Sequence, residues 1–152
     1  MKKIIVVSAF SVVLFLVLGM GMSLSAQAEV ITPVYLENYD LAVESNLHPV
    51  YRKVDKSRPI GSTIEKLLNI DIDIYEASIG FASEWTKDHK VELMGVALED
   101  GLLTVELSDP DRFTSGGSYR VRSLRGQIEK SVLQFGEVDE VKFIRPDHLF
   151  QP

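Results

Sequence analysis

The segment KVELMGVALEDGLLTVELS, residues 90–108, predicts a β-hairpin. Its two halves, residues 90–99 and 102–108, are rich in apolar residues, and the second half alternates apolar with polar side chains. Asp100 and Gly101 lie between them and suit a two-residue type I′ turn, because both central residues of that turn need a positive φ. The sequence therefore predicts two antiparallel strands here.

The residues that follow the hairpin predict a helix and a last strand. A helix is expected over residues 118–135, with Gly136 as its stop. Its apolar residues recur at helical spacing and form one stripe: Val121, Leu124, Ile128, Val132 and Phe135. The strand is expected over residues 138–144, with Val141 and Phe143 toward the core and Lys142 outward.

The residues before the hairpin predict two strands and a short helix. The strands are expected over residues 32–37, where Val34 and Leu36 alternate with polar neighbours, and over residues 47–54. Ser62 and Glu65 match a capping box at the start of the helix. The alternation of Ile70, Ile72 and Ile74 with aspartates indicates an extended piece.

These elements predict the order β-β-α-(β)-β-β-α-β. The fold class is α+β, with two helices packed on one face of a mostly antiparallel sheet. Residues 29–152 form a single domain in this interpretation, since the sequence contains no repeat and no internal linker.

Residues 1–28 predict a secretory signal peptide. Lys2 and Lys3 precede an uncharged apolar run, and Ala26-Gln27-Ala28 supplies a small-x-small cleavage site. We expect cleavage between Ala28 and Glu29. The apolar run is also about the length that spans a bilayer, so an uncleaved membrane anchor is the alternative. Both interpretations predict a secreted or extracytoplasmic domain in the cell envelope.

Composition excludes several function classes. The chain carries a formal net charge of −6, which disfavours general nucleic-acid binding because such binding relies on basic residues. It contains no cysteine, so disulfides and thiol chemistry are excluded. His48, His89 and His148 are isolated in sequence, and zinc needs several converging ligands. The Asp71/Asp73 and Asp109/Asp111 pairs lack the loop pattern of a calcium site. We therefore expect no metal and no cofactor.

Several segments, taken in order, resemble the GerMN domain of spore-germination and sporulation proteins. They span most of residues 34–144 and comprise VYRKV (50–54), EKLL (65–68), Asp100-Gly101 with VELS (105–108), Gln127-Ile128, VLQF (132–135) and Val138-x-x-Val141. Three family features are replaced, by Asn69-Ile70, by Trp85 to Asp88 and by Arg145 to Asp147. The resemblance implies a divergent, single-copy GerMN-like domain of the envelope, without catalytic, cofactor-binding or metal-binding residues.

The candidate contact residues are three arginines and one tryptophan. Arg112, Arg122 and Arg125 belong to the one basic concentration in an acidic chain, and their guanidinium groups suit carboxylates and phosphates. Arg122 and Arg125 are three residues apart and are expected to share one helix face. A solvated helix face is the alternative. Trp85, the only tryptophan, is predicted either to fill the core or to serve as an exposed contact residue.

The function that best fits this sequence is a non-enzymatic envelope module that binds a protein partner or assembles with itself. An anionic cell-wall polymer is a further candidate partner, and the membrane is one only if the leader is uncleaved. The alternative is a secreted inhibitor or chaperone-like domain for an exported enzyme. A cell-wall hydrolase is the third hypothesis, although no G-x-S-x-G motif is present.

Overall fold

The computed structural model describes residues 28–41, 46–85, 88–144 and 146–152. Residues 1–27 of the predicted leader lie outside these ranges. None of the helices within these ranges has the length and apolar character needed to cross a membrane. The helices and strands in chain order are β1 (Glu29–Asn38), β2 (Leu47–Asp55), α1 (Pro59–Leu68), α2 (Ile74–Ser78), β3 (Phe81–Ala82), β4 (Glu92–Glu99), β5 (Leu102–Ser108), α3 (Ser118–Val132) and β6 (Glu140–Ile144).

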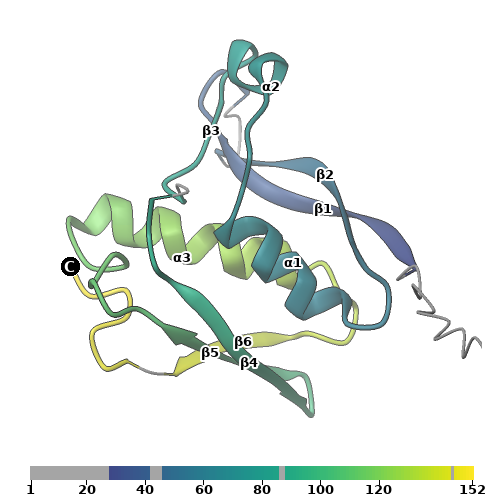
Figure 1. The fold of residues 1–152 in the computed structure, drawn as a ribbon, viewed down its shortest axis with the longest axis vertical. Helices are drawn as coiled ribbons and strands as arrows, with labels where there is room; N and C mark the ends of the chain where they lie inside the picture. Colours follow the sequence, from purple (N-terminus) through teal and green to yellow (C-terminus); the bar gives the residue numbers. More distant parts are fainter. Residues whose placement is uncertain (1–27, 42–45, 86–87, 145) are drawn as a thin grey trace, which may run out of the picture.

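The α+β class is confirmed, and so is the predicted succession of elements, apart from the short helix α2 between α1 and β3. In detail, the strands divide into two three-stranded sheets, ordered β2-β1-β3 and β4-β5-β6, where the sequence predicts one. Helices α1 and α3 lie between the two sheets (Figure 1) and pack against each other. Buried residues of both helices and of both sheets belong to one apolar core.

Most strand pairs are antiparallel, as predicted. The exception is β6, which pairs parallel with β5, from Leu102 opposite Glu140 to Glu106 opposite Ile144. Helix α3 connects these two strands, and such a crossover is what parallel pairing requires. At the hairpin, Asp100 has a φ of 48° and Gly101 a φ of 82°, so the predicted turn is confirmed.

The core extends through both sheets and both long helices. Its fully buried side chains include Val34 and Leu36 of β1, and Leu124, Ile128 and Val132 of α3. They contact buried residues of β5 and β6, namely Leu103, Val105, Leu107 and Val141. The predicted inward faces of α3 and the last strand are therefore confirmed.

Strand β3 pairs only with Glu37 and Asn38 at the end of β1. Polar side chains on α3 and just after it cover the rest of that edge. The backbone N–H of Tyr35 donates to Ser131 Oγ at 2.9 Å, and Gln134 Nε2 donates to the carbonyl of Pro33 at 2.5 Å. Because buried backbone groups need partners, these bonds allow the helix to pack directly against a strand edge.

Three local predictions are wrong. Helix α1 begins at Pro59 with Arg58 as its N-cap, so Ser62 lies inside the helix, where its Oγ accepts from the N–H of Asp55 at 3.0 Å. The capping box occurs instead at Asp73 and Glu76, and it starts α2 at Ile74, where the isoleucine alternation predicts that the extended piece continues. Helix α3 ends at Val132, before the predicted stop at Gly136.

Replacing Gly101 with alanine should lower the free energy of unfolding by about 1–3 kcal/mol, since a strained left-handed residue costs that much. A Cβ atom there would lie 2.2 Å from Asp139 Oδ2, at a φ of 82°. Gly136→Ala is the matched control, because nothing lies within 4 Å of its Cβ position. Urea unfolding of both variants checks this prediction. Equal midpoints for the two would contradict the strained turn.

Candidate functional site

Trp85 belongs to the core. Its side chain is 2% exposed, and its indole N–H donates to the carbonyl of Leu124 at 3.2 Å. The ring centroid lies 5.7 Å from that of Phe113 and 5.4 Å from that of His89. The assignment of Trp85 to a contact surface is therefore wrong, because α3 and the residue 109–114 loop supply the partners that bury it.

The imidazole of His89 is part of this aromatic group. Its Nδ1 accepts from the N–H of Val91 at 3.0 Å, which assigns the proton to Nε2, 2.8 Å from the carbonyl of Leu68. Burial lowers the pKa of His89. Both observations favour the neutral ring, which here serves packing. Within the described ranges, no three His, Asp or Glu side chains gather closely enough to hold a metal ion.

Asp109 and Asp111 are close in sequence but have separate roles. The Asp109 carboxylate is 2% exposed and accepts from the N–H groups of Phe113 and Thr114 at 2.7 and 2.9 Å. It shapes the loop that leads into α3. Asp111 points outward, where its Oδ2 lies 2.9 Å from Lys90 Nζ.

The structure separates the candidate arginines. Arg112 lies on the loop before α3, with a φ of 56° and an exposed side chain. Arg122 lines a small pocket at the end of β1, and Arg125 lines a larger groove beside β6. Spacing of three residues places Arg122 and Arg125 close on α3, but packing of a different sheet on each side of the helix gives them different surroundings. Their part in binding stays a prediction.

Arg120 holds the loop before α3 in place through several contacts. Its Nη1 donates to the carbonyls of Phe113 and Ser115, and its guanidinium lies 4.4 Å from the centroid of the Phe113 ring. Its Nε also forms an ion pair with Glu84 at 3.4 Å. These contacts hold the loop against the helix, so Arg120 has a structural role that its spacing did not reveal.

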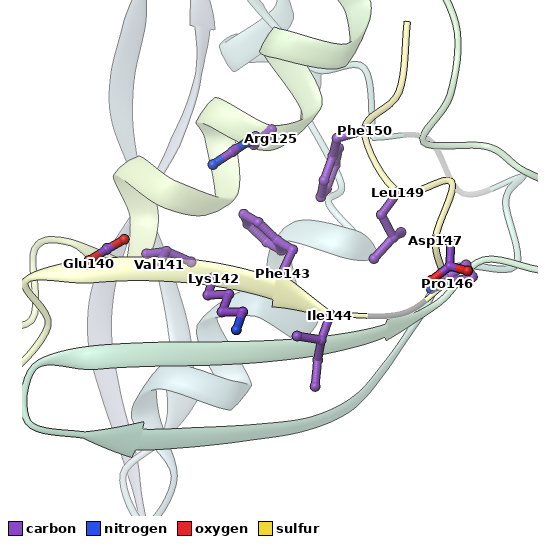
Figure 2. Close-up of a pocket in the computed structure, with 10 residues that line it drawn as sticks. All are labelled: Arg125, Glu140, Val141, Lys142, Phe143, Ile144, Pro146, Asp147, Leu149 and Phe150. Carbon is purple, nitrogen blue, oxygen red and sulfur yellow. The ribbon is translucent and has the colours of Figure 1, made fainter.

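The groove beside β6 has a volume of about 630 Å³. Figure 2 shows Phe143 pointing toward α3, with Arg125 above it and Phe150 opposite. The residues that line the groove are Arg125, Glu140, Val141, Lys142, Phe143, Ile144, Pro146, Asp147, Leu149 and Phe150. They include every residue of β6, so the groove follows the strand along its whole length.

The groove combines an aromatic floor with charged residues of both signs, Arg125 and Lys142 beside Glu140 and Asp147. The ring centroids of Phe143 and Phe150 lie 4.8 Å apart in an edge-to-face arrangement. The Arg125 guanidinium lies 5.6 Å from the centroid of Phe143, and its Nε is 2.7 Å from Glu129 Oε1. Lys142 points away from α3 into solvent (Figure 2). β6 is also the end strand of its sheet, so no further strand among the described residues pairs with its outer edge.

Comparison with known proteins identifies the family. A family model described as Germane, sporulation and spore germination, matches residues 33–145. The chain belongs to the Germane family. No protein with a curated description matches the sequence.

Two solved structures share the fold of this Germane domain. The tandem GerMN domains of the sporulation protein GerM from Bacillus subtilis superpose with a TM-score of 0.56 at 19% identity, over 83% of this chain and 43% of that chain. The first GerMN domain of the same protein gives a TM-score of 0.51 at 15% identity, over 79% of this chain and 85% of that one. This chain thus spans less than half the length of the tandem structure. The resemblance to GerMN domains predicted from sequence is confirmed.

Part of the groove lies within the residues that the family model matches, and part lies beyond them. Arg125 and the whole of β6 lie within residues 33–145, but Pro146, Leu149 and Phe150 lie beyond them. One wall of the groove is therefore built by a C-terminal segment outside the matched range. The sequence signal for this wall is the apolar pair Leu149-Phe150 after Pro146, which is too short to predict an element.

Proposed function

We propose that this Germane domain is a non-enzymatic, extracytoplasmic module of the cell envelope that binds a protein partner or a second copy of itself. The observation that carries the proposal is the groove along β6, an edge strand whose five residues all line it. An unpaired strand edge offers a row of backbone donors and acceptors to an extended segment of another chain. The export signal predicted in residues 1–28 supports the location.

The side chains around the edge add specificity to such pairing. Phe143 and Phe150 give the incoming segment an apolar surface, and aromatic residues are frequent energetic centres of interfaces. Lys142 and Arg125 can pair with acidic residues of the segment, and Glu140 and Asp147 with basic ones, since opposite charges steer association. Backbone pairing would supply affinity, and the aromatic floor and the charged side chains of the groove would select the sequence.

Photo-crosslinking in intact cells tests this proposal. A photoreactive amino acid replaces Lys142 on β6 or, as the control, Lys66 on α1, which is also exposed but does not line the groove. We expect a defined covalent adduct from position 142 and none from position 66. Absence of an adduct at position 142, or equal yields at the two positions, would contradict binding at this edge.

Charge reversal provides the second arm of the experiment. In Arg125→Glu/Lys142→Glu, the adduct formed from a photoreactive residue at position 140 should fall at least about fivefold, since paired charges across an interface contribute to affinity. Lys66→Glu is the matched control, because Lys66 is exposed but lies outside the groove. Equal adduct yields in the two variants would show that the cations beside β6 do not select the partner.

A further inference from the structure

A second pocket lies where the end of β1, the start of β2 and the first turns of α3 meet. Its volume is about 190 Å³, and Glu37, Asn46, Leu47, Tyr119, Arg122 and Ser123 line it. Leu47 forms the apolar wall, and its Cδ1 would lie 3.6 Å from a Cβ at Gly126. The pocket is thus built by the neighbouring strands β1 and β2 together with α3, which comes much later in the sequence.

Glu37 is a buried carboxylate in this pocket. The residue is 4% exposed, although its place in the alternation of β1 predicts a solvent-facing side chain. Its Oε1 accepts from the hydroxyl of Tyr119 at 2.6 Å and from Asn46 Nδ2 at 3.3 Å. Both donors are neutral. Burial of a carboxylate is costly without a cationic partner. Neutral donors do not balance the negative charge of Glu37, so a cationic group bound beside it would be stabilised.

Tyr39 lies close enough to Glu37 to be affected by its charge. Burial and the negative charge of Glu37 together raise the pKa of the Tyr39 hydroxyl. The phenol therefore stays protonated at neutral pH. Tyr39 and Tyr119 thus both lie near the carboxylate, and Tyr119 contacts it through its hydroxyl.

Arg122 brings a positive charge to the same pocket. Its Nε donates to the carbonyl of Ser118 at 3.3 Å within α3. Among the residues that the structure describes, its guanidinium enters no ion pair, and neither does Glu37. Two opposite charges thus line one small cavity from different elements without neutralising each other.

We propose that this pocket binds a free α-amino acid as a zwitterion. The ligand's ammonium group lies against Glu37 and the Tyr119 hydroxyl, and its carboxylate lies against the planar fork of Arg122, which suits a carboxylate. The volume of about 190 Å³ leaves room for a small amino acid such as glycine or alanine. The site is separate from the β6 groove, so its failure would leave the proposed function intact.

Titration of the full chain in mild detergent with L-alanine, D-alanine and glycine tests the proposal, followed by NMR of backbone amides. We expect saturable shifts at Asn46, Tyr119 and Arg122. Methylamine and acetate each carry one of the two charges and should bind at least about tenfold more weakly than alanine, because each loses the hydrogen bonds to one charged group. No saturable binding of any of the three amino acids would overturn the proposal.

Two variants test which side chain binds each charged group of the ligand. Arg122→Gln and Glu37→Gln should each weaken alanine binding at least about tenfold, and Arg112→Gln, an exposed control outside the pocket, should leave it unchanged. Arg122 is exposed, so its variant remains folded, and Tyr119→Phe replaces the Glu37 variant if that one does not fold. Unchanged affinity in Arg122→Gln, or methylamine binding equal to alanine, would overturn the zwitterion site.

Discussion

Replacing Trp85 with alanine should lower the free energy of unfolding by about 3–5 kcal/mol, because large-to-small changes of buried aromatic residues remove transfer energy and leave a cavity. The side chain is 2% exposed and donates to the carbonyl of Leu124. A domain of this size has roughly 5–15 kcal/mol in total, so the variant should be close to unfolding under physiological conditions. Urea unfolding followed by circular dichroism measures the loss.

Tyr75→Ala is the control for this prediction. Tyr75 is an aromatic residue of α2 that is 68% exposed, and changes at such positions usually stay within about 0.5 kcal/mol. A loss at Trp85 as small as that at Tyr75 would show that the tryptophan does not fill the core, and its role as a surface contact would return.

Ile128→Ala should cost about 2–5 kcal/mol for the same reason. Ile128 is fully buried on α3, in the core that also holds Val105 of β5 and Val141 of β6. Leu133→Ala is the control just after the same helix, since Leu133 is 44% exposed and should lose less than about 1 kcal/mol. Thermal and urea unfolding check both values. If Ile128→Ala stayed within about 0.5 kcal/mol of the parent, as surface changes do, the inward face assigned to α3 would be wrong.

Some features of this fold follow from residues that are close in sequence. The β4–β5 hairpin depends on Asp100 and Gly101, which tolerate a positive φ, and on the apolar residues on either side. The buried stripe of α3 depends on apolar side chains that recur at helical spacing. Each signal lies within one element or one hairpin, so the sequence predicts it without knowledge of the rest of the chain.

Other local patterns occur more than once and therefore mislead. Ser62 and Glu65 match a capping box, but Pro59 starts the helix earlier and places Ser62 in its interior. The same chemistry at Asp73 and Glu76 does cap a helix. The spacing and the residue types do not distinguish these two sites. The neighbouring proline and the packing of α1 distinguish them.

The sequence by itself determined the α+β class, the order of the elements apart from α2, and the hairpin, because alternation, helical period and turn chemistry act between near neighbours. It also carries the ordered series of segments that resembles the GerMN domain. Only the tertiary structure decided that Trp85 is buried, that Arg122 and Arg125 line different pockets, and that Glu37 is covered by Tyr119, which is 82 residues away. Burial of one side chain depends on which distant element packs over it. No pattern within a single strand or helix carries that information.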